Sequence, residues 1–388
     1  MMKKILIVNN NMEVGGVQKS LSDLLWAIHD KYDVTLCLFA PEGAYMVQLP
    51  PNIRILCPKG PFRYLGRHQS LWRGADRLLR GGYALLAKTF GRQAAMKVML
   101  LLEKPLPGEY DCAISFLHNG NIKNFYGGTQ EFVLRKVHAR KKVAFLHCDY
   151  GSNGADHPVN NRLLETFDAI AACSDGCREA FLKVLPDLDS RCVTVRNAHR
   201  YGAIREMAKK DPVTYPEGDC NLLMVSRLSK EKGIQRAMDA VAPMILQGMP
   251  VRLHIVGGGN LLQSLQQHAT QLGIRDRVHF YGEQENPYRY MANADLLLMT
   301  SYHEAAPMVL EEAWCLGLPM LTMRTTSSKE MVTDRGCGWV CENEEDAFRL
   351  ALEDILIHKK YLLCREAMAK QTMDNTEMMD QFDRLIRE

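Results

Sequence analysis

Short apolar runs alternate with helix-length segments along the chain, and this alternation predicts parallel α/β units. Runs such as ILIV and VAFL are apolar at nearly every position, as in strands buried on both faces of a sheet. In the first half, the predicted strands are Lys4–Val8, Val34–Phe39, Ile53–Cys57, Asp111–Phe116, Lys142–Leu146, Ala169–Cys173 and Cys192–Arg196. The helices predicted between them are Val17–Ile28, Asn160–Phe167 and Cys177–Leu185.

A polar stretch rich in proline and glycine, residues 211–219, then indicates a linker or domain edge. Beyond it the predicted strands are Asn221–Val225, Arg252–Val256, Val278–Tyr281, Leu296–Met299, Met320–Thr322 and Trp339–Val340. The predicted helices are Ile234–Gln247, Leu261–Leu272 and Met308–Leu316. We therefore expect an α/β protein with two Rossmann-like, doubly wound domains facing a cleft, and ligands at the carboxyl ends of the strands. The expected domains are 1–200 and 201–372, with 373–388 as a helix that packs back on the first domain.

Composition narrows the class of protein. The chain has 388 residues, of which 47% are apolar, and this is enough for two cores. A net charge of +3 gives no sign of a nucleic-acid binder. The twelve cysteines include no C-x-x-C pair, so we interpret them as reduced, buried thiols rather than as metal ligands or disulfides. The first apolar run is too short for a signal peptide, which predicts a cytoplasmic protein.

Glycines follow the first predicted strand. Gly15 and Gly16 open a predicted helix, where backbone N–H groups can approach an anion closely. The alternative is that the two glycines only form a tight turn between strand and helix. The pattern is not G-x-G-x-x-G, which argues against a dinucleotide site and an NAD-dependent oxidoreductase.

Two cations follow the first strand of the second half. Arg227 and Lys232 lie in the loop SRLSKEKG, just past the strand's carboxyl end. Fixed cations can stabilise the negative charge that develops on a departing diphosphate, without a metal ion. Either cation alone would be interpreted as part of a solvated turn.

Carboxylates form the third cluster. Glu304 follows a predicted strand, Pro307 indicates a helix start, and Glu312 lies among apolar residues of that helix. A carboxylate in such a place needs hydrogen-bond donors, and the hydroxyls of a sugar can supply them. The adjacent Glu311 is interpreted as a surface residue.

Together these motifs resemble glycosyltransferase family 4, whose members are retaining enzymes of the two-domain GT-B fold. Glu304 and Glu312 are separated by seven residues, as in the family's E-x7-E motif. VSRLSKEKGI resembles its G-R-L-x-x-x-K-G signature, LHIVGGG its strand and glycine turn, VTVRN its V-x-x-N, and GGVQKS its glycine loop. The resemblance covers nearly the whole chain and is strongest over residues 221–340.

The resemblance implies a metal-independent hexosyltransferase without cofactor. The donor would be a nucleotide diphosphate sugar, with uridine favoured by family frequency, and the acceptor a glycan or lipid-linked glycan of the cell surface. The implied catalytic residues are His147, Glu304, Arg227 and Lys232. The implied donor-binding residues are Gly15, Gly16, Asn197, Arg227, Lys232, Gly257, Gly282, Ala306, Pro307, Met308, Val309 and Glu312.

The sequence departs from the family's motifs at some positions, and alternative functions stay open. The family's Glu-Gly-Phe-Pro is Glu-Ala-Ala-Pro here, beginning at Glu304, so the sugar's identity cannot be transferred. An epimerase, a phosphorylase or a non-catalytic nucleotide-sugar-binding protein of the same shape stays open. Asp187 and Asp189 form a D-x-D, which other glycosyltransferases use for a metal, but they follow Pro186 and are interpreted as a turn.

The segment Lys59–Lys104 carries ten basic and two acidic residues, with aromatic and leucine side chains between them. This composition suits an anionic membrane surface, such as the inner face of the cell membrane. The alternative is a solvated crossover in the acceptor-binding domain.

Overall fold

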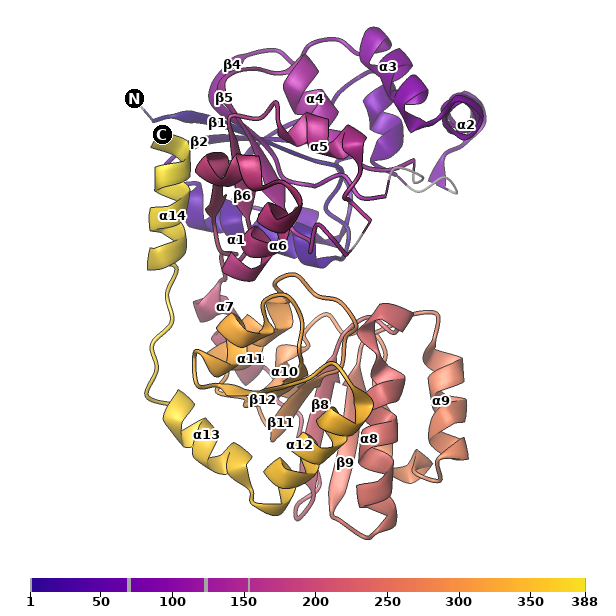
Figure 1. Ribbon diagram of the computed structural model, residues 1–388, viewed down its shortest axis with the longest axis vertical. Helices are drawn as coiled ribbons and strands as arrows, with labels where there is room; N and C mark the ends of the chain where they lie inside the picture. The colour runs from indigo at the N-terminus through magenta and orange to yellow at the C-terminus, as the bar shows by residue number, and fades with distance from the viewer. Residues whose placement is uncertain (1, 68–70, 122–124, 153, 388) are drawn as a thin grey trace. The chain divides into compact units, whose positions relative to one another are not determined.

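The computed structural model describes residues 2–67, 71–121, 125–152 and 154–387. The chain forms two compact units, Met1–His199 with Asn375–Glu388, and Arg200–Asp374 (Figure 1). Residues 68–70 of the basic segment lie outside the described residues.

The N-terminal unit contains a parallel sheet of seven strands. In spatial order the strands are β3 (Arg54–Leu56), β2 (Asp33–Leu38), β1 (Lys4–Asn9), β4 (Glu109–Ser115), β5 (His138–Leu146), β6 (Ala169–Ala172) and β7 (Cys192–Thr194). The helices are α1 (Gly16–Ile28), α2 (Gly74–Phe90), α3 (Arg92–Leu102), α4 (Thr129–Lys136), α5 (Pro158–Leu164), α6 (Asp175–Val184) and α14 (Thr376–Arg387). Strand order reverses between β1 and β4, which makes this pair the switch point of a doubly wound sheet.

The last helix of the chain completes the core of this unit. On α14, Met378 and Phe382 pack in the same buried cluster as Ile5 and Ile7 of β1. Polar contacts fix the helix as well, since the Tyr32 hydroxyl donates to a carboxylate oxygen of α14 at 2.6 Å.

The C-terminal unit repeats the design with six parallel strands. In spatial order they are β10 (Val278–Phe280), β9 (Val251–Val256), β8 (Cys220–Val225), β11 (Leu296–Met299), β12 (Met320–Met323) and β13 (Gly338–Cys341). The helices are α7 (Tyr201–Lys209), α8 (Ile234–Leu246), α9 (Leu262–Gln271), α10 (Tyr288–Met291), α11 (Met308–Cys315), α12 (Glu345–Ile357) and α13 (Lys360–Met368). The switch point lies between β8 and β11.

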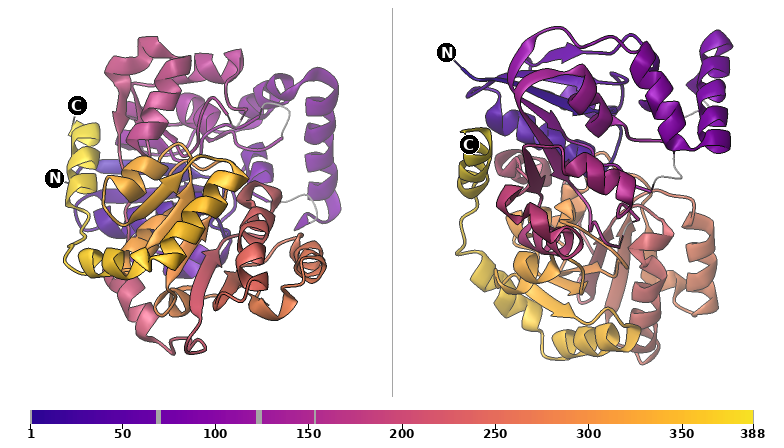
Figure 2. Two further views of the ribbon diagram at one scale, coloured as in Figure 1. Left: turned by 60° about the horizontal axis from the view of Figure 1, so that its bottom comes forward. Right: turned by 45° about the horizontal axis from the view of Figure 1, so that its top comes forward.

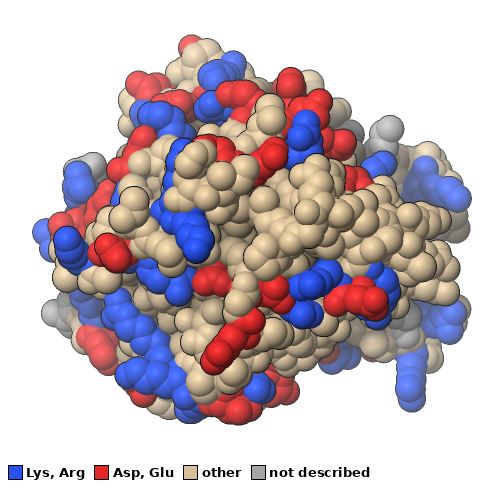
Figure 3. All heavy atoms as spheres, turned by 90° about the horizontal axis from the view of Figure 1, so that it is seen from below, with Lys and Arg blue, Asp and Glu red and all other residues tan. Residues whose placement is uncertain are grey.

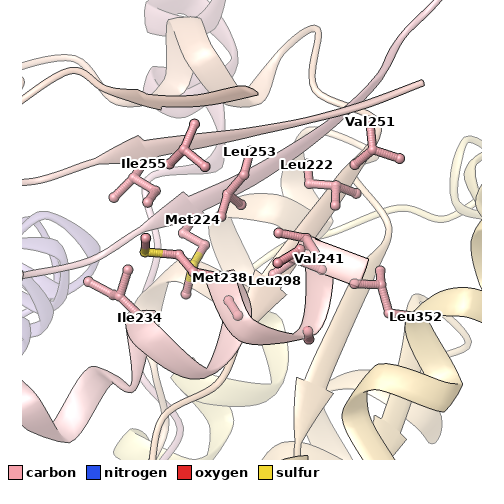
Figure 4. Close-up of a cluster of buried hydrophobic side chains, with 14 of the residues drawn as sticks. Leu222, Met224, Ile234, Met238, Val241, Val251, Leu253, Ile255, Leu298 and Leu352 are labelled. Atoms are coloured by element: carbon pink, nitrogen blue, oxygen red, sulfur yellow. The ribbon is translucent and has the colours of Figure 1, made fainter. Parts of the chain in front are cut away.

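Aliphatic side chains fill the space between this sheet and its helices. Figure 4 shows Leu222, Leu253 and Ile255 of the sheet turned toward Met238 and Val241 of α8. All five are 0% exposed. Truncating such a side chain to alanine typically costs about 2–5 kcal/mol, so this packing holds β8 and the loop that follows it in place.

The α/β prediction is confirmed, and each predicted strand overlaps an observed one. The linker interpretation of residues 211–219 is wrong, because this stretch lies inside the C-terminal unit, between α7 and β8. The preceding helix already belongs to that unit, since Ile204 and Ala208 pack in its core. Within the described ranges, no helix is both long and apolar enough to cross a membrane.

Candidate functional site

Three loops meet beyond the carboxyl ends of β8, β9 and β11, at the switch point of the C-terminal sheet. Backbone hydrogen bonds join them: Leu228 N–H donates to Gly258 O at 2.8 Å, and Tyr302 N–H donates to Glu231 O at 2.9 Å. Open α/β sheets bind ligands at such a crevice. Most of the site residues predicted in this half of the chain lie on these loops or on the helix that follows.

Two glycines let these loops approach one another. Gly233 has a φ of 60°, and a Cβ there would lie 2.2 Å from the carbonyl oxygen of Thr300. Gly257 has a φ of 142°, and a Cβ would lie 1.8 Å from Ser226 O. The Gly257 N–H donates to Gly282 O at 2.8 Å, so two predicted donor-binding residues are neighbours. Close backbone packing therefore explains the glycine at 257 even without a ligand.

Lys232 and Glu304 form an ion pair at the centre of this group. Lys232 Nζ lies 2.5 Å from Glu304 Oε1, and the side chains are 20% and 13% exposed. The Ser301 hydroxyl donates to the same carboxylate oxygen at 2.8 Å. An ammonium has three N–H donors, so two remain for other acceptors such as phosphate oxygens.

Arg227 lies on the same loop but is far more accessible. Its side chain is 69% exposed, and its Nη2 lies 3.5 Å from Glu231 Oε1. Such an exposed pair contributes little to stability. Most of the guanidinium's five N–H donors are thus available to an anion.

A buried arginine that sequence reasoning missed fixes the loop carrying Glu304. Arg236 is 5% exposed, and its Nη1 donates to Thr300 O at 3.3 Å and to Asn343 Oδ1 at 2.7 Å. Asn343 Nδ2 donates to Ser301 O and Tyr302 O, both at 3.3 Å. These contacts come from three separate segments, and the sequence contains no signal for them.

The helix α11 brings the second predicted carboxylate to this edge. Its N-cap is Pro307 with a φ of −67°, so the helix begins one residue later, at Met308, beside Ala306 and Val309. Glu312 is 5% exposed, and the Tyr288 hydroxyl lies 3.5 Å from its Oε1.

The surface interpretation of Glu311 is wrong. This residue is 7% exposed and forms an ion pair with Arg335. The Tyr201 hydroxyl also lies 3.4 Å from its Oε2. The basic partner is 24 residues away along the chain, so the local sequence could not reveal it.

In the N-terminal unit, Gly15 and Gly16 lie where β1 leads into α1. Gly15 has a φ of 179°, an extended conformation open to any residue, and α1 begins at Gly16. A Cβ at Gly16 would meet no heavy atom within 4 Å. Neither position needs glycine for its backbone conformation, although a Cβ at Gly15 would lie 2.5 Å from Gln18 Oε1, so the anion-site and tight-turn interpretations both stay predictions. An uncovered backbone at a helix N-terminus is compatible with anion binding.

Two other predicted features lie elsewhere in this unit. Asn197 follows β7, and its Oδ1 accepts a hydrogen bond from Ser20 of α1 at 2.7 Å. Asp187 and Asp189 lie on the 3-10 helix Pro186–Arg191, where Asp189 pairs with Arg178.

His147 follows β5 at the carboxyl edge of the same sheet. Its ring packs against Phe116 and Phe145, with centroid distances of 4.5 and 5.7 Å. The Nε2 atom is buried and has no hydrogen-bond partner among the described residues. Burial, helped by the nearby His118, lowers the pKa of His147 to about 3, so the ring is neutral at pH 7.

A second histidine, His118, was not predicted as a site residue from the sequence. It follows β4, the strand next to β5, and burial lowers its pKa to about 4. A histidine after each of two adjacent parallel strands is a signal that could have paired them.

Comparison with known proteins defines the class. Residues 207–372 match the family model of glycosyl transferases group 1. The C-terminal unit is therefore a group 1 glycosyltransferase domain.

Among curated relatives, N-acetyl-alpha-D-glucosaminyl L-malate synthase of Bacillus anthracis is 29% identical over 208 residues, or 52% of this chain and 54% of that protein. The lipopolysaccharide glucosyltransferase WaaG of Escherichia coli K12 is 35% identical over 31% of this chain and 32% of its own length. The chain thus spans about half or less of these relatives.

Solved structures share the fold over the whole chain. The Anabaena protein HepE, solved in complex with UDP and glucose, has a TM-score of 0.67 at 21% identity, covering 99% of both chains. WaaG has a TM-score of 0.61 at 18% identity, covering 99% of this chain and all of the other. The fold is that of the GT-B glycosyltransferases.

Proposed function

We propose that the protein is a retaining, metal-independent glycosyltransferase that transfers a hexose from a UDP-sugar to a glycan or lipid-linked acceptor. The observation that carries this proposal is the Lys232–Glu304 pair with Arg227 beside it, at the switch point of a group 1 domain. Two cations and a carboxylate at the crevice where open α/β sheets bind ligands support binding of a nucleotide sugar there.

The leaving group determines the role of the cations. Cleavage of the glycosidic bond leaves negative charge on the diphosphate, and fixed N–H donors that meet this charge lower the barrier. We assign Arg227 and Lys232 to this task. Glu304, held by Ser301 and Lys232, accepts hydrogen bonds from hydroxyls of the transferred sugar.

The buried Glu312 is assigned to the ribose. This carboxylate, 5% exposed at the edge where the loops meet, can accept hydrogen bonds from the two hydroxyls of a ribose. The UDP in the HepE complex supports uridine as the base.

In the N-terminal unit, we assign the edge beyond β1, β4 and β5 to the acceptor. His147 is neutral at pH 7, so it acts there as a hydrogen-bonding group and not as a fixed cation. The lipopolysaccharide in the name of WaaG supports a lipid-linked acceptor.

The test is sugar transfer from a panel of UDP-, GDP- and ADP-sugars, followed by release of the nucleoside diphosphate. We expect turnover with a UDP-sugar, an α-linked product from an α-linked donor, and full activity in excess EDTA. If EDTA abolished activity and Mn²⁺ restored it, the metal-independent assignment would be wrong. An inverted product would contradict retention.

A further inference from the structure

The helices α2 and α3 form a hairpin that lies at one end of the N-terminal unit (Figure 2). They are joined at Gly91, which has a φ of 87°. None of the 17 residues of α2 is buried. An amphipathic helix normally covers its apolar stripe with the protein core, so this one leaves apolar surface to be covered by something else.

Several leucine side chains on both helices are exposed to solvent. Leu78 is 78% exposed, Leu85 is 60% exposed, and Leu101 on α3 is 83% exposed. Leu78 and Leu85 are seven residues apart, so they lie on the same side of α2. Isolated exposed leucines are common on proteins, but a group of them on neighbouring helices indicates an interaction surface.

Exposed cations accompany these leucines. Arg77 and Lys88 are eleven residues apart, close to three helical turns, so they share one side of α2, and Lys97 is exposed on α3. These three form no ion pair within the described part of the chain.

The two acids of the segment do not neutralise this surface. Asp76 accepts hydrogen bonds from Arg63 and from the Tyr64 hydroxyl, at 2.5 and 2.7 Å. Glu103 is 4% exposed and accepts from the backbone N–H groups of Gly60 and Phe62, both at 3.0 Å. The charge left on the outside of the hairpin is therefore positive. By contrast, basic and acidic side chains are interspersed over most of the face drawn in Figure 3.

We propose that the exposed side of this hairpin docks on an anionic lipid surface. Its docking face consists of Arg77, Leu78, Leu85, Lys88, Lys97 and Leu101. Leucines enter the boundary between headgroups and acyl chains, while the cations contact lipid phosphates. A protein partner with an acidic groove is the competing occupant, and it would leave vesicles unbound. The proposal does not depend on the sugar or nucleotide, since the group 1 domain is the other unit.

Sedimentation with vesicles tests this directly. Wild-type protein should pellet with vesicles of phosphatidylcholine and phosphatidylglycerol at low salt, bind more weakly at high salt, and ignore phosphatidylcholine alone. The triple variant Arg77→Gln/Lys88→Gln/Lys97→Gln should bind about a hundredfold more weakly, because each basic side chain near such a surface contributes about fivefold, or about 1 kcal/mol.

A matched control removes the same charge elsewhere. Arg205, Lys210 and Lys370 are exposed in the other unit, and replacing all three by glutamine should leave vesicle binding unchanged. A second triple variant, Leu78→Ser/Leu85→Ser/Leu101→Ser, should keep its stability and lose most of its binding.

Three results would overturn the proposal. The wild-type protein could stay in the supernatant at low salt. The charge variant and its control could lose vesicle binding equally, or the leucine-to-serine variant could bind vesicles as well as the wild type. Thermal shifts with UDP, measured on every variant, keep failure of docking separate from failure of the donor site.

Discussion

We expect the substitution Arg227→Ala to lower the rate of sugar transfer strongly while leaving the stability of the fold almost unchanged. The Arg227 side chain is 69% exposed and makes one long contact of 3.5 Å to Glu231, so Arg227→Ala removes almost nothing from the folded state. Exposed pairs at this helical spacing are worth about 0.3–0.5 kcal/mol. We therefore expect the free energy of unfolding to change by less than about 0.5 kcal/mol.

The expected effect on the reaction is several times larger. Loss of one preorganised donor to developing charge typically lowers the rate on the order of 10²–10³-fold, or about 2.7–4 kcal/mol. Initial rates of UDP release measure this effect, and urea unfolding of the same preparation measures stability.

Lys230→Ala is the matched control. Lys230 lies three residues away on the same loop, is exposed, and forms no ion pair in the described ranges, so its loss removes the same unit of charge. We expect this variant to keep its rate within about threefold, as is usual for exposed sites away from the chemistry. If both variants lost the same rate, Arg227 would act only through the general field of the loop, and if neither lost rate, its assignment to the leaving group would be wrong.

Three further predictions concern residues around the site. Glu312→Gln should weaken UDP binding measured by calorimetry, and unchanged affinity would remove its ribose assignment. Asn343→Ala removes one acceptor of Arg236 and the amide donor that contacts the carbonyl oxygens of Ser301 and Tyr302, so unfolding in urea should become about 1–3 kcal/mol easier and kcat should fall; an unaltered protein would show that the network is dispensable. Burial lowers the pKa of His254 to about 4, whereas a histidine in the unfolded chain has a pKa of about 6.5. Between about pH 6.5 and 4 the imidazole is therefore protonated mainly in the unfolded chain, so the free energy of unfolding falls as the pH falls. From pH 7 to 5 this one group should cost about 2 kcal/mol, and His254→Gln should remove that part of the slope.

The strands were predictable because both sheets are buried on two faces, which leaves continuous apolar runs such as Leu222–Met224. The hairpin α2–α3 was not predicted as two helices. No residue of α2 is buried, so no buried stripe marks that helix, whereas α3 does bury Ala95, Met96 and Met99. Helices α12 and α13 were missed for a different reason, since no motif drew attention to them, whereas α14 lies within the segment 373–388 that was expected to be a helix.

Within the site, charged residues beside strand ends could be found from the sequence, and the structure brings Lys232 and Glu304 together across 72 residues. The residues that hold the loop of Glu304 in place could not be found from the sequence. Arg236 and Asn343 meet across 107 residues, and Glu311 differs from Glu312 only in the neighbours that folding supplies.

We expect the switch point of the C-terminal sheet to bind a nucleoside diphosphate. Calorimetric titration of wild-type protein with UDP, GDP and ADP in the presence of EDTA tests it most directly. We predict one UDP per chain, weakened strongly by a Lys232→Ala/Arg227→Ala double variant and unaffected by Lys230→Ala. No heat of binding with any of the three nucleotides, or equal affinity in wild type and double variant, would contradict the claim.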